Sequence, residues 1–233
     1  MNRSNGNVLL IILVAIALFG LLTIALSDSF DGDANLDEDR ARVRVAHILE
    51  QETIIRNAYK MLRFANDCSI TEVNFAYDAD PTYNTNAPTS NRCSLYHKNG
   101  GGLDKIAPME DTQDTLDNAY EEWWIETSGL EIDGLGLTDS GTATCPGCEL
   151  SILLYNVDDT VCQRLNLGTT GTKTIYTLAG AEEIIPHAFD GTFSNDNLID
   201  ATDDAELVEQ RSFCVKEAGG DLRNVYVAVL EVR

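Results

Sequence analysis

The chain has 233 residues, which is enough for one domain with appendages or for two small domains. Its 38 Asp and Glu outnumber its 16 Lys and Arg, and the formal net charge of −22 argues against binding to nucleic acid or to anionic lipid head groups, which need a cationic surface. Hydrophobic residues make up 44% of the chain, so a buried core is expected and a wholly disordered chain is excluded.

An uncharged apolar segment lies close to the N-terminus. Residues 8–26 read VLLIILVAIALFGLLTIAL, and a helix of this length spans roughly 28 Å, close to the thickness of a bilayer core. Arg3 is the only charged side chain before the segment, whereas residues 27–39 are rich in Asp and Glu. Because positive charge flanks the cytoplasmic end of membrane helices, we expect a single-pass membrane protein whose C-terminal domain lies outside the cytoplasm.

Three kinds of segment fit this pattern: a plain signal anchor, a cleaved secretory signal and a type IV prepilin signal. The apolar stretch is long for a cleaved signal, and Ala25 and Ser27 form only a weak cleavage site. The leader MNRSNG is short and polar, ends at Gly6, and is followed directly by the apolar helix, which contains Gly20. Residues 1–27 therefore resemble the N-terminus of type IV pilins and pseudopilins.

This resemblance implies a route of processing and assembly. A prepilin peptidase would cut after Gly6 and expose Asn7 as the new N-terminus. The helix over residues 7–27 would hold the subunit in the lipid of the inner membrane and would later pack against the helices of other pilin-like subunits. Type IV pilins and most pseudopilins have Glu as the fifth residue after the cut, whereas this chain has Ile11. The missing Glu and the large domain favour a minor or atypical subunit.

A long helix is expected after an acidic linker, residues 28–36. Asp37 is the predicted N-cap, and no Gly or Pro follows it before Asp67. Apolar side chains recur at helical spacing and are interrupted once, by Glu52. The recurring positions are Val45, Ile48, Ile55, Tyr59 and Leu62, and Leu49, Ala58 and Ala65 are expected to widen the stripe. The pattern indicates an amphipathic helix with one buried face. If the chain is pilin-like, as the resemblance implies, this helix is the spine of the fold. The alternative interpretation is an ordinary core helix that follows a signal anchor.

The remainder of the chain reads as rich in strands and loops. Alternating or continuous apolar runs predict strands over residues 70–77, 94–98, 149–157, 172–178 and 225–232. A short helix is predicted over residues 158–167, capped by Asp158 or Asp159. Residues 112–124 are predicted to form a short helix or an irregular crossover, and residues 193–209 mostly loop. The expected fold is therefore α+β, pilin-like, with a long N-terminal helix packed on an antiparallel sheet, and the extracytoplasmic domain covers residues 37–233.

All six cysteines follow the apolar segment. They are Cys68, Cys93, Cys145, Cys148, Cys162 and Cys214. An even number outside the cytoplasm indicates disulfides, and six cysteines allow 15 connectivities. Proximity along the chain favours pairing the first with the second, and the turn formers Pro146 and Gly147 favour pairing the third with the fourth; this leaves the fifth to pair with the sixth. The sequence CPGC at residues 145–148 has two further interpretations, a redox motif or half of a zinc site completed by Cys162 and Cys214.

No pattern points to a catalytic, metal or cofactor site, so we expect a protein that is not an enzyme and has no cofactor. The acids at residues 31–35 match the start of a calcium-binding EF-hand loop, but Leu36 and Arg42 occupy positions that require Gly and Glu. The histidines are in no metalloprotease motif; they are His47, His97 and His187. The pair Trp123 and Trp124 could stack on sugar rings.

Taken together, the sequence predicts a structural subunit of a type IV pilus or type II secretion-type filament, processed after Gly6 and assembled through its N-terminal helix. Its expected partners are the prepilin peptidase, other pilin-like subunits and membrane lipid, and nucleic acid is not among them. The alternative is a membrane-anchored extracytoplasmic binding module that does not enter filaments. A third hypothesis is an exported redox enzyme that uses Cys145 and Cys148.

Overall fold

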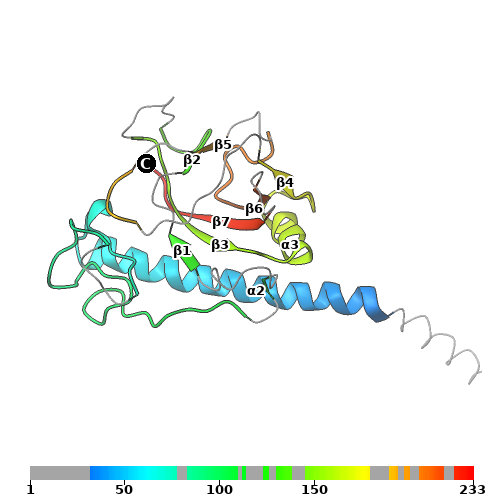
Figure 1. The fold of residues 1–233 in the computed structure, drawn as a ribbon, viewed down its shortest axis with the longest axis horizontal. Helices are drawn as coiled ribbons and strands as arrows, with labels where there is room; N and C mark the ends of the chain where they lie inside the picture. The colour runs from blue at the N-terminus through cyan, green and yellow to red at the C-terminus, as the bar shows by residue number, and fades with distance from the viewer. Residues whose placement is uncertain are drawn as a thin grey trace, which may run out of the picture. The chain divides into compact units, whose positions relative to one another are not determined.

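The computed structural model describes ten stretches of the chain (Figure 1). They are residues 32–77, 83–109, 112–113, 123–125, 130–137, 145–178, 189–193, 197–199, 205–217 and 223–233. Within these stretches no helix combines the length and the apolar character needed to cross a membrane. The predicted leader, 1–6, and the predicted membrane helix, 7–27, lie outside the described residues.

The chain divides into two compact units, residues 1–40 and residues 41–233. The described part of the first unit is the beginning of helix α2 (Gly32–Lys60). This helix begins before Asp37, so residues 32–36 of the predicted linker are helical and Asp37 is not the N-cap. The physical reason is local, because residues 33–36 contain neither proline nor glycine to break a helix.

In the second unit, α2 continues into one turn of π-helix, η2 (Met61–Ala65), and then ends. Asp67, just after the end of this turn, adopts a left-handed backbone conformation with φ of 52°, which does not continue a right-handed helix. A short 3₁₀ helix, η3 (Ile70–Glu72), follows. The helix therefore ends in a tight, non-repetitive connection to the rest of the domain.

The main sheet has five strands in the order β1-β3-β7-β6-β4. They are β1 (Trp123–Ile125), β3 (Leu150–Tyr155), β7 (Asn224–Glu231), β6 (Ser212–Lys216) and β4 (Tyr176–Thr177). The first four pair antiparallel, whereas β4 pairs parallel to β6. A second sheet pairs β2 (Leu130–Ile132) parallel to β5 (Asn197–Ile199).

The α+β class is confirmed, but the expectation of an antiparallel sheet is wrong, because the sheets are mixed and parallel. Both parallel pairs join strands that are separated by more than thirty residues of chain. A connection of that length allows a strand to return in the same direction, whereas a hairpin turn does not. Sequence periodicity shows that a strand exists but carries no information about the direction of its neighbour.

Both faces of the main sheet are buried, and two separate hydrophobic clusters cover them. On β3 and β7, alternate side chains such as Ile152 and Tyr226 belong to one cluster with α2, whereas Leu153 and Val227 belong to the other. The second cluster includes side chains of the small sheet. This explains why β3 reads as a continuous apolar run rather than an alternating one.

Two predicted strands are not strands. Residues 70–77 begin with the 3₁₀ helix η3 and reach residues 94–98 through one isolated bridge, Asn74 to Ser94. Ser69 and Glu72 form a capping box that starts a helical turn, and this local hydrogen bonding competes with an extended strand.

Among the later elements, three predictions are confirmed and other elements were not predicted. The final strand is confirmed as β7, the buried strand as β3, and the short helix as α3 (Asp159–Thr169) with Asp158 as its N-cap. The region expected to be a helix or crossover contains strand β1 in its described part. Strands β2, β5 and β6 were not predicted, and β2 and β5, with three residues each, are too short to show a period.

Candidate functional site: the docked helix and the CPGC cluster

Helix α2 is fixed to the sheet along one face. The predicted apolar stripe is buried: Ile48, Ile55 and Leu62 are 0% exposed, and Tyr59 is 2% exposed. Val45 packs against the same cluster. These positions repeat every three or four residues, so they lie on one side of the helix. Their burial confirms the amphipathic pattern, and Ala58 is buried as well, whereas Leu49 and Ala65 are exposed and do not widen the stripe. Figure 1 shows the part of α2 after residue 40 running alongside the strands.

Glu52, which interrupts the stripe, is held by polar partners at the sheet. Its Oε1 accepts a hydrogen bond from Arg56 Nη2 at 2.6 Å, and its Oε2 accepts one from the Tyr226 hydroxyl at 2.7 Å. Arg56 also donates from Nη1 to the carbonyl oxygen of Val229 at 2.6 Å. The carboxylate is therefore part of the contact between α2 and β7 rather than a defect in it.

A second polar contact joins the end of the helix to the end of β7. Arg63 donates from Nε and Nη2 to the two carboxylate oxygens of Glu231, both at 2.8 Å, and the Tyr59 hydroxyl donates to the same carboxylate. Leu150 pairs with Glu231 while Ser151 pairs with Val229, so one extra residue lies in β7 at this point. This β-bulge directs Glu231 toward α2, because strict alternation would place Leu230 and Glu231 on opposite faces.

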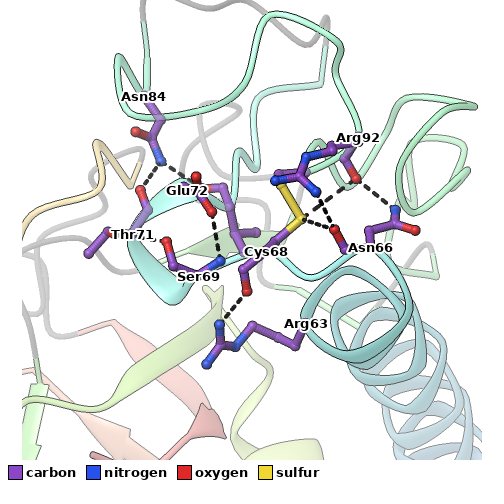
Figure 2. Close-up of a disulfide and its surroundings, with 10 residues drawn as sticks. Arg63, Asn66, Cys68, Ser69, Thr71, Glu72, Asn84 and Arg92 are labelled. Carbon is purple, nitrogen blue, oxygen red and sulfur yellow. Dashed lines mark hydrogen bonds between the residues drawn. A yellow bond between two sulfur atoms is a disulfide. The ribbon is translucent and has the colours of Figure 1, made fainter.

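The connection after the helix is held by a disulfide and by reciprocal hydrogen bonds (Figure 2). Cys68 and Cys93 are bonded. Asn66 donates from Nδ2 to the carbonyl oxygen of Arg92 at 2.7 Å, and Arg92 donates from Nη1 to the carbonyl oxygen of Asn66 at 2.8 Å. Arg63 donates to the carbonyl oxygen of Cys68. The end of α2 therefore cannot move independently of the loop that carries Cys93.

The last helix, α3, is held against β6 by a covalent bond and by one amide. Cys162 and Cys214 are bonded. Asn166 is 0% exposed; its Oδ1 accepts from the amide of Cys214 at 2.7 Å, and its Nδ2 donates to the carbonyl oxygens of Cys214 and Thr174, each at 2.7 Å. Strand β4 pairs with β6 only at Val215 and Lys216, so it does not reach Cys214. The side-chain amide of Asn166 takes the place of a strand there, because it bonds both the backbone amide and the backbone carbonyl of Cys214.

The CPGC sequence forms a buried cluster with two glutamates. Cys145 and Cys148 are bonded to each other and are both 0% exposed. Glu131 is 1% exposed, and its Oε2 lies 3.9 Å from the sulfur of Cys145. This contact is not a hydrogen bond, because a disulfide sulfur carries no hydrogen. The ligand atoms of Glu131, Cys145 and Cys148 all lie within 4.8 Å of one another.

Strand β2 positions the second glutamate of this cluster. Glu149 directly follows Cys148, its amide donates to the carbonyl oxygen of Leu130 at 2.9 Å, and its Oε2 accepts from the amide of Ile132 at 3.0 Å. Burial raises the pKa of Glu149 to about 7, the Glu131 carboxylate contributes to the increase, and the hydrogen bond from Ile132 opposes it. Its Oε1 is buried and has no hydrogen-bond partner in the described part of the chain.

The structure places the remaining candidate residues as follows. The pairing of the six cysteines is the one that proximity favoured, so Cys162 and Cys214 bond to each other and cannot complete a zinc site at the CPGC sequence. Trp123 is buried and donates from Nε1 to Gln51 Oε1 at 2.9 Å, which leaves it no free face for a sugar ring. The processing residues Gly6 and Asn7 lie outside the described residues.

Sequence reasoning missed both glutamates of the cluster. Glu149 is the only one with a local signal, since an acid stands between CPGC and the apolar run LSILLY. His47 lies on α2, His97 accepts a hydrogen bond from the amide of Asn99 at 3.1 Å, and His187 lies outside the described residues. Neither described histidine joins the cluster.

Comparisons of the chain with models of known protein families, with curated proteins and with solved structures found no match. A functional proposal for this chain therefore rests on its own residues and contacts.

Proposed function

We propose that this protein is a structural subunit, a minor or atypical pilin or pseudopilin, of a type IV pilus or type II secretion-type filament. The observation that supports it most is the long helix α2, which is fixed to the sheet from residue 41 onward by a buried stripe and two polar contacts. A filament subunit needs such a helix, because its outer domain must stay attached to its own N-terminal helix when the N-terminal helices of neighbouring subunits pack together.

The N-terminal sequence supplies the assembly element of this proposal. The uncharged residues 8–26 follow a polar leader that ends at Gly6, the arrangement that pilin-like proteins share. In the membrane their apolar side chains face lipid, and in a filament they would face the equivalent helices of neighbouring subunits. Both environments remove about the same apolar surface from water, so the transfer from membrane to filament does not expose it.

The outer face of α2 offers contacts to neighbouring subunits. Apolar side chains are exposed there, and Phe64 is the extreme case at 86%. The exposed members of this face are Val43, Ile54, Met61 and Phe64. An exposed group of this kind on a soluble domain commonly marks a surface that a partner covers. We therefore assign it to contacts with other pilin-like subunits.

The proposed location is the inner membrane, crossed once, with the domain outside the cytoplasm and ultimately in an extracellular filament. Three disulfides and no free cysteine fit an oxidising compartment. The acidic composition keeps a domain exposed to solvent soluble through like-charge repulsion. Ile11, at the position where most relatives of the proposed class have Glu, favours a minor or atypical subunit.

The first experiment is the mass of the mature N-terminus. The full chain is expressed with a prepilin peptidase, and the terminal peptide from membranes is identified by mass spectrometry. We expect a start at Asn7 that is lost in Gly6→Ala and retained in the control Gly20→Ala. An intact Met1 would favour the membrane-anchored binding module instead, and a start near Asp28 would show a secreted protein; either result refutes the proposal.

A second experiment separates processing from assembly. Sheared filaments from a host that expresses the chain are purified and probed for it, with the Gly6→Ala variant as the unprocessed control. The processed chain should be found in the filament fraction and the variant only in membranes. A chain that is cut at Gly6 but never enters filaments would retain the pilin-type signal and contradict the structural role.

A further inference from the structure

The CPGC cluster contains a combination of groups that a purely structural disulfide does not require. The 145–148 disulfide is neutral, yet a buried carboxyl group, Glu131, lies 3.9 Å from the sulfur of Cys145, and a second buried acid, Glu149, directly follows Cys148 in the chain. Burying a carboxylate is costly unless it is paired, hydrogen-bonded or coordinated to a cation. Arg233 is the cation that acts on Glu149, and its Nη1 donates to the carbonyl oxygen of Cys145 at 3.4 Å. The ligand atoms of Glu131, Cys145 and Cys148 all lie within 4.8 Å of one another, which is close enough for one small ion to reach all three after modest movement.

Reduction of the disulfide would add two ionisable sulfur groups to this cluster. Two thiols would replace the sulfur–sulfur bond, and thiols next to each other in a C-x-x-C sequence ionise readily when a cation can bind them. The sulfur and oxygen atoms would then be gathered in one buried place. Glu149 Oε1, buried without a hydrogen-bond partner in the described part of the chain, is available for a further contact.

We propose that Cys145, Cys148 and Glu131 form a Zn²⁺ site when the 145–148 disulfide is reduced, with water in the fourth position. The same short loop would then be closed in two alternative ways, by a disulfide under oxidising conditions and by the metal under reducing ones. This inference does not depend on the filament role. It differs from the earlier zinc hypothesis, because Cys162 and Cys214 take no part in it.

The geometry is compatible with tetrahedral zinc. Zinc–sulfur bonds of about 2.3 Å and zinc–oxygen bonds of about 2.1 Å place a sulfur and an oxygen ligand about 3.6 Å apart. The Cys145 sulfur and Glu131 Oε2 lie 3.9 Å apart, so this pair needs almost no movement. The two sulfurs must separate to about 3.8 Å, which the bonds of their side chains allow once the disulfide is broken. Thiolate and carboxylate together suit Zn²⁺ better than the harder Mg²⁺ or Ca²⁺.

The chemistry balances in two steps. In the first, a dithiol reductant transfers two electrons and two protons to the disulfide; its own two thiols become a disulfide, and Cys145 and Cys148 become thiols. In the second, Zn²⁺ binds the two sulfurs and displaces two protons to solvent. Reoxidation reverses both steps and releases the metal.

The test uses the full chain in detergent micelles. The protein is reduced with a phosphine, which takes an oxygen from water to become its oxide, and the reagent is removed under argon before metal is added. Co²⁺ is then titrated as a spectroscopic substitute, followed by Zn²⁺ in competition. We expect one metal ion per reduced chain, with the near-ultraviolet thiolate-to-cobalt band and the visible bands of tetrahedral coordination, and no uptake by the oxidised chain.

Matched variants separate this site from adventitious binding to thiols. The double variant C145S/C148S should lose the metal, whereas C68S/C93S, which removes the same number of thiols, should keep it. Glu131→Gln should weaken Zn²⁺ binding about tenfold or more. The control Glu217→Gln replaces another buried glutamate and should leave the affinity unchanged.

Three results would overturn the proposal. They are a reduced wild-type chain that shows no thiolate-to-cobalt band, a C145S/C148S variant that binds as tightly as the wild type, and an E131Q variant of unchanged affinity. Because the cobalt spectrum of the wild-type chain reports sulfur ligands directly, the test does not depend on every variant folding. Circular dichroism of each variant identifies any that do not fold.

Discussion

Removing the Glu52 carboxylate should weaken the attachment of α2 to the sheet. In Glu52→Leu the Tyr226 hydroxyl, in a fully buried residue, loses its carboxylate acceptor, and Arg56 loses its ion-pair partner. An unsatisfied buried polar group costs about 1–3 kcal/mol. The side chains of Arg56 and Glu52 are 23% and 13% exposed, so the pair falls short of the roughly 3–5 kcal/mol that breaking a fully buried pair costs. We expect unfolding to be easier by about 2–4 kcal/mol.

A double-mutant cycle measures the contact itself. Tyr226→Phe, E52L and the double variant are compared with the wild type by urea unfolding of the full chain in micelles, followed by circular dichroism. A hydrogen bond to a charged group contributes about 1.5–3 kcal/mol, so the double variant should be less destabilised than the sum of the single ones by about that amount. The control Glu50→Leu, at an exposed position of the same helix, should stay within about 0.5 kcal/mol of the wild type.

This reasoning would be refuted by an E52L variant as stable as the wild type, or by a coupling energy near zero. Either result would mean that the apolar stripe of α2 alone determines its attachment to the sheet. Glu52 would then be tolerated at the contact rather than required there.

Three further predictions concern other contacts. Asn166→Leu should lower the free energy of unfolding by about 3 kcal/mol or more in urea titrations, because it leaves the buried amide and carbonyl groups of Cys214 without these partners and also removes a hydrogen bond to the carbonyl oxygen of Thr174. Asp158→Ala should cost about 1 kcal/mol in the same assay, because it removes the side chain that caps α3; a change below about 0.3 kcal/mol would show that the cap contributes little. Burial raises the pKa of both Tyr59 and Tyr226 above 10. Above pH 10 the unfolded chain therefore loses protons that the native protein keeps, so the free energy of unfolding falls as the pH rises. Each tyrosine should contribute a fall of about 1.4 kcal/mol per pH unit. Stability measured between pH 10 and 11 should therefore fall less steeply in Tyr59→Phe, and an unchanged slope would contradict the assignment.

Local patterns in the sequence were sufficient for the elements that depend on neighbouring residues. The spacing of Ile48, Ile55 and Leu62 predicted the buried face of α2, and Asp158 predicted the start of α3. Two of the favoured disulfide pairs, Cys68–Cys93 and Cys145–Cys148, follow from separations of 25 and 3 residues along the chain, and the third pair, Cys162–Cys214, is the one that then remains. The N-terminal signal and its processing site remain predictions of the sequence alone, because residues 1–31 are outside the described structure.

Other features were decided by contacts between distant residues. In the sequence, Glu52 only interrupts the apolar stripe of the helix. In the structure it accepts a hydrogen bond from Tyr226, which is 174 positions away. In the same way Glu131 is brought to the CPGC loop by strand pairing and not by proximity in the chain. The direction of β4 beside β6 is likewise set by a long connection, about which periodicity carries no information.

The sequence by itself determined an amphipathic helix, a buried central strand, the cap of the last helix and the favoured cysteine pairs, because each depends on the spacing of residues within a few turns or within one loop. Only the tertiary structure decided the order and direction of the strands, the polar attachment of α2 to β7, and the meeting of two glutamates with the CPGC disulfide. These depend on which surfaces pack together, and packing is settled by the shape and burial of the whole domain rather than by any short stretch of its chain.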